Sequence, residues 1–314
     1  MSSIVTITFN PAIDKSLSIA AMVPDKKLKC SRAVYNPGGG GINVARAIKK
    51  LGGEAVAVYL SGGDTGKKIT HLLAEDLIEC IAINIKESTR ENLVVVDESS
   101  KKQYLFDMPG PEVSEEEWNT CLRTIEGLSD VEYIVASGSL PPGVPNDIFA
   151  KISLIAQKKN AKLFADTSGE PLRQAVKAGV YLIKPNMREL AALVGKEELD
   201  PESVADSARI IIDQGNCEAV VVSLGRLGAM LVTKDLAINI AAPDLPTKST
   251  VGAGDSMVAG IVMSLASGKT LIEAVQFGVA CGTAATIHPG TELCSKSDVE
   301  GLYNMIRSHD YCAA

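Results

Sequence analysis

Disulfide frameworks and structural zinc sites need cysteine and histidine arrangements that this sequence lacks. Its seven cysteines, at positions 30, 80, 121, 217, 281, 294 and 312, are odd in number and include no CxxC pair. The three histidines, at positions 71, 288 and 309, do not have the spacing of metal ligands. The pattern argues against both kinds of site and favours a reducing, cytoplasmic location.

Long apolar runs are also absent. No run reaches the roughly 18 residues that a membrane span needs, and the N-terminal MSSIVTITFN does not have the pattern of a secretory signal. The formal net charge of −7 argues against non-specific binding to nucleic acid. We therefore expect no membrane and no nucleic-acid partner, while a few placed cations could still bind an anionic small substrate.

The common nucleotide-binding fingerprints are missing as well. No GxGxxG follows the first apolar run. GGDTGKK at 62–68 and ASGKT at 266–270 resemble pieces of a P-loop, but Ser61 and Met263 stand where that motif needs its first glycine. We expect both stretches to be turns.

What the sequence does contain is an alternation of short β-rich apolar runs with amphipathic segments. Hydrophobic residues make up 46% of the chain, which is enough for a full globular core. The alternation predicts an α/β body whose parallel sheet is covered by helices on both faces. The candidate strands are Ile4–Phe9, Ala55–Leu60, Tyr133–Ser137, Lys162–Asp166, Tyr181–Lys184 and Ala219–Ser223. The candidate helices include Ile42–Leu51, Thr65–Leu73, Pro145–Lys159, Val204–Gln214, Ser256–Ala266, Leu271–Ala285 and Ser297–Arg307.

Two regions, Leu17–Tyr35 and Asn92–Phe106, are strand-like without intervening helices. In the second, the polar DESSKK joins two β-rich arms, which indicates a hairpin. We expect a small antiparallel sheet that serves as a lid, a dimer surface or both.

PGGGGINVARA at 37–47 places four glycines before a helix that carries Asn43 in its first turn. Glycine lets the main chain touch a ligand without a Cβ in the way. The amides of Gly39, Gly40 and Gly41, with the Asn43 side chain, could therefore bind a polyhydroxylated ligand. The alternative is a flexible turn followed by a polar residue at a helix start.

Two further segments follow predicted strands, where ligands collect in open α/β sheets. FNPAID at 9–14 supplies Asp14, which could accept hydrogen bonds from paired hydroxyls or could be a turn aspartate. SGSLPPG at 137–143 places Ser139 at the same edge of the sheet.

IKPNMREL at 182–189 brings Lys184, Asn186 and Glu189 to a helix start. Asn186 and Glu189 are three residues apart and share one face, where they could hold the water shell of a nucleotide-bound Mg²⁺. Glutamate at such a position is also simply favourable with the helix dipole. After another strand, VVSLGRLGAM at 221–230 supplies a weaker candidate for a nucleotide-cradling turn, made of Ser223, Gly225 and Gly228.

TKSTVGAGDSMVAG at 247–260 raises the question of why an acid stands at a predicted anion site. The helix N-terminus and the bare backbone of Gly252, Ala253 and Gly254 suit a phosphate. Asp255 projects from the first helical turn, where it could take the proton of an attacking hydroxyl while the amides stabilise the growing charge. The alternative is an aspartate that only stabilises the helix start.

GGGGINVA, KPNxxEL and TVGAGD together resemble the ribokinase-like pfkB family of carbohydrate kinases, in order and over nearly the whole chain. The resemblance implies one kinase domain over residues 1–314. It implies a three-layer α/β/α body with a mostly parallel central sheet and a β-sheet lid from about 14–36 and 90–108. It also implies that the lid is the contact of a homodimer.

The resemblance further implies Mg²⁺–ATP as phosphoryl donor and assigns roles to matching positions. Asp255 is the base, and Gly252, Ala253 and Gly254 form the anion hole. The sugar falls at Asp14, Gly39, Gly40, Gly41, Asn43, Ser139 and Asp255. Its phosphate falls at Arg90 and at Lys27, which could reach across the dimer. The nucleotide falls at Lys184, Asn186, Ser223, Gly225 and Gly228, with Glu189 organising Mg²⁺. The carbonyls of Ser249, Val251, Ala285 and Gly290 could bind K⁺.

Within the family, TRENL, MPG, SGSLPPGV and VSLG are most similar to the isozyme-2 branch of the bacterial 6-phosphofructokinases. Gly40 stands where 1-phosphofructokinases and tagatose-6-phosphate kinases carry lysine. The resemblance therefore implies ATP-dependent phosphorylation of fructose 6-phosphate at its 1-hydroxyl, a glycolytic step. The alternatives are a tagatose-6-phosphate kinase, a 1-phosphofructokinase and, from a different class, a sugar-phosphate sensor without turnover.

Overall fold

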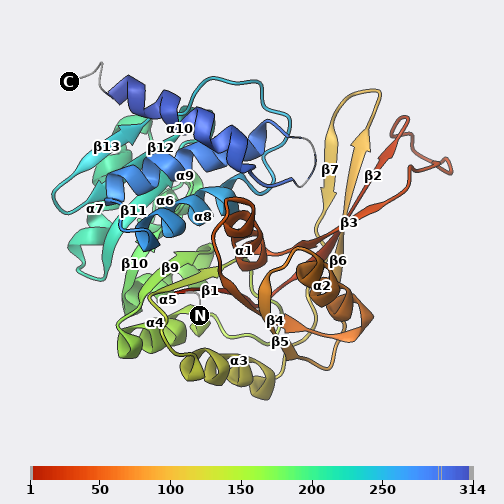
Figure 1. The fold of residues 1–314 in the computed structure, drawn as a ribbon, viewed down its shortest axis with the longest axis horizontal. Coiled ribbons are helices and arrows are strands. Elements are labelled where there is room, and N and C mark those ends of the chain that lie inside the picture. Colours follow the sequence, from red (N-terminus) through yellow and green to blue (C-terminus); the bar gives the residue numbers. More distant parts are fainter. Residues whose placement is uncertain (1–2, 289, 291, 311–314) are drawn as a thin grey trace.

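A large sheet forms the centre of the molecule in a computed structural model, which describes residues 3–288, 290 and 292–310 (Figure 1). Its strand order is β13-β12-β11-β10-β9-β8-β1-β4-β5. All neighbouring pairs are parallel except β11–β12 and β12–β13. The strands are β1 (Ile4–Thr8), β4 (Val56–Ser61), β5 (Glu79–Asn84), β8 (Tyr133–Ser137), β9 (Lys162–Asp166), β10 (Val180–Ile183), β11 (Cys217–Ser223), β12 (Ala229–Thr233) and β13 (Ala237–Ile240).

Helices cover both faces of this sheet, and each face has its own hydrophobic core. One core contains α1 (Gly40–Lys50), α2 (Gly63–Glu75), α8 (Ala253–Ala266), α9 (Leu271–Thr286) and α10 (Lys296–Asp310). The other contains α3 (Glu115–Gly127), α4 (Ile148–Lys159), α5 (Gly169–Ala178), α6 (Met187–Leu193) and α7 (Val204–Asp213). Alternate residues of a buried strand face opposite cores: Ile4 packs into the first and Val5 into the second. The predicted three-layer α/β/α body is confirmed.

The second sheet is small and extends away from the body (Figure 1). Its order is β3-β2-β6-β7, with β2 (Ala12–Ile19), β3 (Val34–Gly38), β6 (Arg90–Asp97) and β7 (Gln103–Phe106). The β6–β7 hairpin is antiparallel as predicted, but β2 and β6 are parallel. The expectation of an antiparallel sheet was therefore wrong for this pair. The two strands come from separate excursions of the chain, so no tight turn forces them to run in opposite directions.

One of the two P-loop-like stretches was also predicted wrongly. Residues 63–68 of GGDTGKK are not a turn, because α2 begins at Gly63 and continues to Glu75. ASGKT does contain the expected turn, at Ser267 and Gly268 after α8. Among the residues the structure describes, no helix is long and apolar enough to cross a membrane. The six cysteines in this part of the chain are free thiols.

Candidate active site

Lys184, Asn43 and Asp255 lie where the parallel strands of the large sheet end, as predicted, together with Asp166 and Ser137, which were not predicted. Lys184 directly follows β10, Asp166 is the last residue of β9, and Ser137 is the last residue of β8. The N-terminus of α1 packs against the end of β1, where the Ile42 N–H donates to Oγ1 of Thr8 at 2.9 Å. The N-terminus of α8 faces the same edge, since a methyl group added at Gly254 would lie 3.2 Å from Nζ of Lys184.

Asp255 lies in the first turn of α8 and contacts α1 across the sheet edge. Gly252 caps the helix in the left-handed conformation, with φ 75°, which favours glycine. Nδ2 of Asn43 donates to Oδ2 of Asp255 at 2.9 Å, so two residues far apart in the sequence meet as the resemblance implies. Burial, and then the charge of Asp166, raises the pKa of Asp255 to about 7, against the lowering effects of Asn43 and Lys184. A carboxyl with this pKa is poised to exchange a proton near neutral pH.

Lys184 is buried and points toward the backbone of the predicted anion hole. A methyl group added at Gly254 would lie 3.2 Å from its Nζ. Nζ forms an ion pair with Oδ1 of Asp166 at 3.2 Å. Burial lowers the pKa of Lys184, but attraction to Asp166, Asp255 and Glu189 outweighs it, so the pKa is raised and the amine stays charged. Sequence reasoning did not single out Asp166, although its place at the end of the predicted strand Lys162–Asp166 was an available signal.

A pocket of about 400 Å³ opens beside the N-terminus of α8. Six of the residues that line it were predicted for the nucleotide site or the anion hole: Asn186, Ser223, Gly225, Gly228, Ala253 and Gly254. Apolar side chains such as those of Met257, Val279 and Leu245 complete the wall. The pocket therefore combines a bare helix terminus with an apolar surface of the kind that suits a flat heteroaromatic base.

Asn186 and Glu189 form a capping box at the start of α6. The Asn186 N–H donates to Oε2 of Glu189 at 2.8 Å, and the Glu189 N–H donates to Oδ1 of Asn186 at 2.9 Å. The capping box gives both residues a structural role, whereas the alternative stated from the sequence was only a favourable interaction of Glu189 with the helix dipole. A role of Glu189 toward Mg²⁺ stays a prediction.

Two of the residues predicted for the sugar, Asp14 and Ser139, belong to a second hydrogen-bonded group, centred on β2 and β6. Asp14 lies on β2 and accepts a bond from Nδ2 of Asn92 at 3.0 Å. Its burial raises its pKa, opposed by this bond and by the charges of Arg90 and Arg46. Asn10, which was not singled out, joins two predicted residues: its Nδ2 donates to Oγ of Ser139 at 3.0 Å, and its carbonyl accepts from Nη2 of Arg90 at 3.2 Å.

The glycine run has packing reasons of its own. A methyl group at Gly40 would lie 2.3 Å from Oγ of Ser137, and one at Gly41 would lie 2.4 Å from the carbonyl oxygen of Ile7. Gly39 caps α1 with φ 111°. These glycines therefore let α1 approach β1 and β8, and their contacts with a ligand stay a prediction.

Within one chain, Lys27 lies far from Arg90, the other residue predicted to bind the phosphate of the sugar. It is exposed in the loop between β2 and β3, beyond the Ile19–Cys30 bridge. Arg90 pairs in register with Ala12 at the opposite end of β2. Seven residues of extended strand separate the two ends by about 20 Å.

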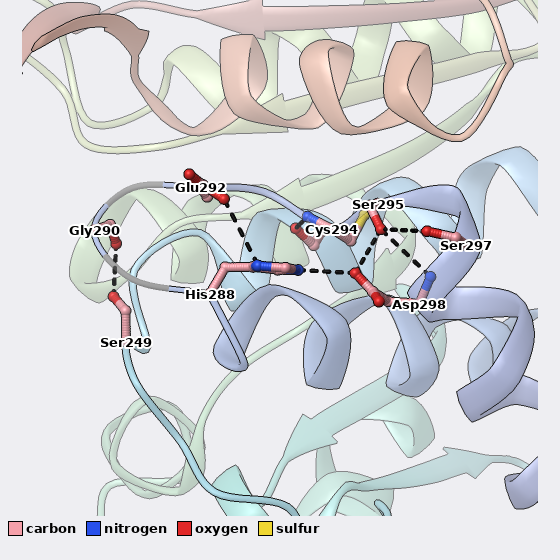
Figure 2. Close-up of polar contacts among 9 residues, drawn as sticks. Ser249, His288, Gly290, Glu292, Cys294, Ser295, Ser297 and Asp298 are labelled. Atoms are coloured by element: carbon pink, nitrogen blue, oxygen red, sulfur yellow. Dashed lines mark hydrogen bonds and ion pairs between the residues drawn. The ribbon is translucent and has the colours of Figure 1, made fainter.

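Three of the four residues predicted for K⁺ are linked by hydrogen bonds beside the C-terminal end of α9, and Figure 2 shows Ser249 and Gly290 among them. Oγ of Ser249 donates to the carbonyl of Gly290 at 2.7 Å and accepts from the Val251 N–H at 3.2 Å. Ala285 is buried in α9, and a K⁺-binding role of these carbonyls stays a prediction. Nε2 of His288 and Oδ2 of Asp298, 2.8 Å apart, tie the same loop to α10.

Comparison with known proteins identifies the family of this chain. The model of the pfkB family of carbohydrate kinases matches residues 3–298. The chain belongs to this family. It is 41% identical over 304 residues to the ATP-dependent 6-phosphofructokinase isozyme 2 of Escherichia coli K12, covering 96% of this chain and 98% of that protein.

Solved structures agree with the sequence comparison. Phosphofructokinase-2 from E. coli in complex with potassium has a TM-score of 0.93 at 41% identity, covering 98% of this chain and 100% of that one. The same protein in complex with fructose 6-phosphate has a TM-score of 0.92 at 40% identity with the same coverage. Thermotoga maritima ribokinase, at 21% identity and a TM-score of 0.76 over 97% of this chain and 100% of that one, confirms the ribokinase-like fold.

Proposed function

We propose that this pfkB-family kinase transfers the γ-phosphoryl group of ATP to the 1-hydroxyl of fructose 6-phosphate, giving fructose 1,6-bisphosphate in glycolysis. One observation carries the proposal. Asp255, with a pKa of about 7, directly follows Gly254 in the wall of the pocket beside α8, and the charge of Asp14, which Asn92 contacts, also acts on its carboxyl. The similarity to E. coli isozyme 2 selects fructose 6-phosphate within the family.

In the proposed mechanism Asp255 accepts the proton of the attacking hydroxyl, and Asn43 fixes the orientation of its carboxylate. The amides from Gly252 to Asp255 face the transferring group. The positive end of the α8 dipole therefore stabilises the negative charge that grows there during transfer. Lys184 adds a positive charge beside Gly254. Phosphoryl transfer depends mainly on such positioning and charge stabilisation.

Mg²⁺ would be held mainly by the nucleotide and by water. Within residues 3–288, 290 and 292–310, no three histidine, cysteine or acidic side chains gather as a metal site. This fits an ion that keeps several waters and binds substrate phosphates. Glu189, whose charge reaches Lys184, would orient those waters. The ion would neutralise phosphate charge during transfer.

The sugar would lie against Asp14, Ser139, Asn43 and the backbone of residues 39–41. Its 6-phosphate would meet Arg90 and the Lys27 side chain of a second protomer. The small sheet supports this dimer, because it exposes large apolar side chains, among them Val34, Leu105 and Phe106 at 59%, 53% and 43%. E. coli phosphofructokinase-2 also has a tetrameric inhibited form.

The test is ADP release with Mg²⁺–ATP, comparing kcat/KM for fructose 6-phosphate, tagatose 6-phosphate, fructose 1-phosphate and adenosine. We expect a clear preference for fructose 6-phosphate. Preference for another sugar phosphate would keep the mechanism and move the enzyme to another branch of the family. Thermal stabilisation by sugar phosphate without ADP release would instead support the sensor.

A further inference from the structure

Arg90, the predicted ligand of the sugar phosphate, already has an acidic partner. Its Nη1 donates to Oδ1 of Asp107 at 2.5 Å and to the carbonyl of Met108 at 2.8 Å, and its Nη2 donates to the carbonyl of Asn10 at 3.2 Å. Within the described part of the chain, Nε is buried without a hydrogen-bond partner. A phosphate that approaches Arg90 therefore finds the Asp107 carboxylate already bound to Nη1, the nitrogen that would otherwise donate to the phosphate.

The three contacts of Arg90 differ in how easily a ligand could replace them. Two are backbone carbonyls, which fix the plane of the guanidinium. The third belongs to a side chain that is 66% exposed, whereas the Arg90 side chain is 9% exposed. Asp107 is thus the one partner that can rotate into solvent while Arg90 stays in place.

The backbone around Asp107 keeps its carboxylate near the site even after such a rotation. Asp107 follows β7, which pairs with β6 through Leu93 and Phe106. The next residue is fixed from two directions: the Met108 N–H donates to Oδ1 of Asn92 at 3.1 Å, and its carbonyl accepts from Arg90. Asn92 in turn binds Asp14, so Asp107 is connected to the predicted sugar-binding group.

We propose that Asp107 is an internal counterion of the phosphate subsite, which occupies Arg90 in the free protein and lowers the affinity for the phosphate of the sugar substrate. The proposal rests on the function proposed above and identifies a residue that tunes it. A phosphate dianion must displace the carboxylate from Nη1 and then remain close to its charge. Ligands without the sugar contacts, such as inorganic phosphate, would be held weakly for the same reason.

The size of the effect follows from the exposure of Asp107. Because the Asp107 side chain is 66% exposed, water can solvate its carboxylate once a phosphate displaces it from Arg90, but the residual repulsion acts on every bound phosphate. Removal of one negative charge several ångströms from a dianion in a watery site should strengthen its binding about fivefold at low salt. Mobile ions screen such repulsion, so the gain should shrink as ionic strength rises toward 1 M, where the Debye length is about 3 Å.

The experiment compares wild type with Asp107→Asn, which keeps the shape and removes the charge, and with Asp107→Glu, which keeps the charge. Glu91→Gln is the matched control, because Glu91 is an exposed acid on β6 next to Arg90 and its side chain points to the opposite face of the strand. KM is measured for fructose 6-phosphate, unphosphorylated fructose and ATP. The Kd of fructose 6-phosphate is measured separately by calorimetry without ATP, at low and high salt.

We expect Asp107→Asn to lower both KM and Kd for fructose 6-phosphate about fivefold at low salt. We expect no change for fructose or ATP, and none in Glu91→Gln or Asp107→Glu. A merely structural role for Asp107 would weaken binding instead. Unchanged or weaker binding of fructose 6-phosphate by Asp107→Asn, or a gain that salt does not reduce, overturns the proposal.

The two proposals fail in different ways. If wild type binds fructose 6-phosphate without turnover, the kinase assignment fails, and the Kd values alone decide the role of Asp107. If wild type turns over fructose 6-phosphate and Asp107→Asn does not improve binding, only the counterion role fails. If wild type binds no fructose 6-phosphate, both are overturned.

Discussion

Replacement of Asp255 by asparagine should lower the catalytic activity and raise the free energy of unfolding. The amide has nearly the shape of the carboxylate and can still contact Asn43, but it cannot accept a proton from the substrate. General-base catalysis contributes about 10²- to 10⁴-fold, so we expect kcat to fall at least about 10²-fold. Because Asp255 has a pKa of about 7, wild-type kcat/KM should rise with pH and level off above about 7. The residual activity of the variant should not show this rise.

The expected gain in stability follows from the same pKa. Asp255 has a pKa of about 7 in the fold against 3.8 as a model value, so the protonated form favours the native state. This contribution is fully present below about pH 4 and is lost as the pH rises to 7. A shift of about 3 units corresponds to at most about 4 kcal/mol. This ceiling already includes the attraction to Lys184. Relaxation and water penetration reduce such burial penalties in real proteins, so we expect about 2 kcal/mol in favour of Asp255→Asn at pH 8, or about 3 °C in Tm.

The assay is thermal unfolding at pH 5 and pH 8 together with steady-state kinetics. Asp64→Asn is the control, because Asp64 also lies in the first turn of a helix but its side chain is 98% exposed. If Asp255 only stabilises its helix, both variants should lose a few tenths of a kcal/mol and keep their activity. A variant of Asp255 that melts below wild type at pH 8, or that keeps more than a tenth of kcat, would refute the reasoning.

Four further predictions concern other parts of the structure. Arg90→Ala should raise KM for fructose 6-phosphate about 10- to 100-fold and leave KM for ATP nearly unchanged; equal effects on both would contradict its assignment. Gly40→Ala should cost about 1–3 kcal/mol in denaturant unfolding because the new Cβ would lie 2.3 Å from Oγ of Ser137, whereas Gly301→Ala, in open space on α10, should gain up to about 1 kcal/mol. Leu105→Asp should halve the mass measured by light scattering if the small sheet forms the dimer, and an unchanged mass would place the interface elsewhere. Replacement of KCl by NaCl at equal ionic strength should lower the Tm if the loop at Gly290 binds K⁺, and identical melting in both salts would remove that assignment.

The sequence predicted the interior of the body better than its edges. Tyr133–Ser137 and Lys162–Asp166 were placed correctly because the central residues of both strands are buried and apolar, which gives a clear run. β5, β12 and β13 were not predicted. β5 and β13 are edge strands with half of their positions exposed, and their sequences, ECIAIN and AINI, carry no comparable signal. The inner strand β12 begins at Ala229, inside the VVSLGRLGAM stretch that was interpreted as a turn. Asn92–Phe106 was correctly predicted to contain β6 and β7, whereas Leu17–Tyr35 overlaps β2 and β3 only at its ends, and residues 20–33 form no strand apart from an isolated bridge at Cys30. The parallel pairing of β2 and β6 depends on tertiary structure alone.

Within the site, motifs identified the residues on helix starts, and only the fold identified their partners. Asp255, Asn43 and Lys184 belong to contiguous patterns with a chemical meaning that can be stated from spacing. Asp166 and Asp107 belong to no such pattern, and their importance arises because folding places them on Lys184 and Arg90. The glycine run is the opposite case. Its pattern was easy to see in the sequence, but part of the reason for glycine at these positions is the close packing of α1 against β1 and β8.

The two cations predicted to meet phosphates show how an acidic protein can bind anions at both ends of one site. Lys184 and Arg90 each have a side chain that is 9% exposed and an acidic partner, so neither is a bare buried charge in the free protein. The partners differ: Asp166 is 16% exposed, while Asp107 is 66% exposed. A phosphate that reaches Lys184 must share it with Asp166, whose charge also raises the pKa of Asp255. A phosphate that reaches Arg90 can instead displace its partner into water. Asp166, which stays in place, therefore helps to set the pKa of Asp255. Asp107, which a phosphate can displace, sets only the affinity for the substrate.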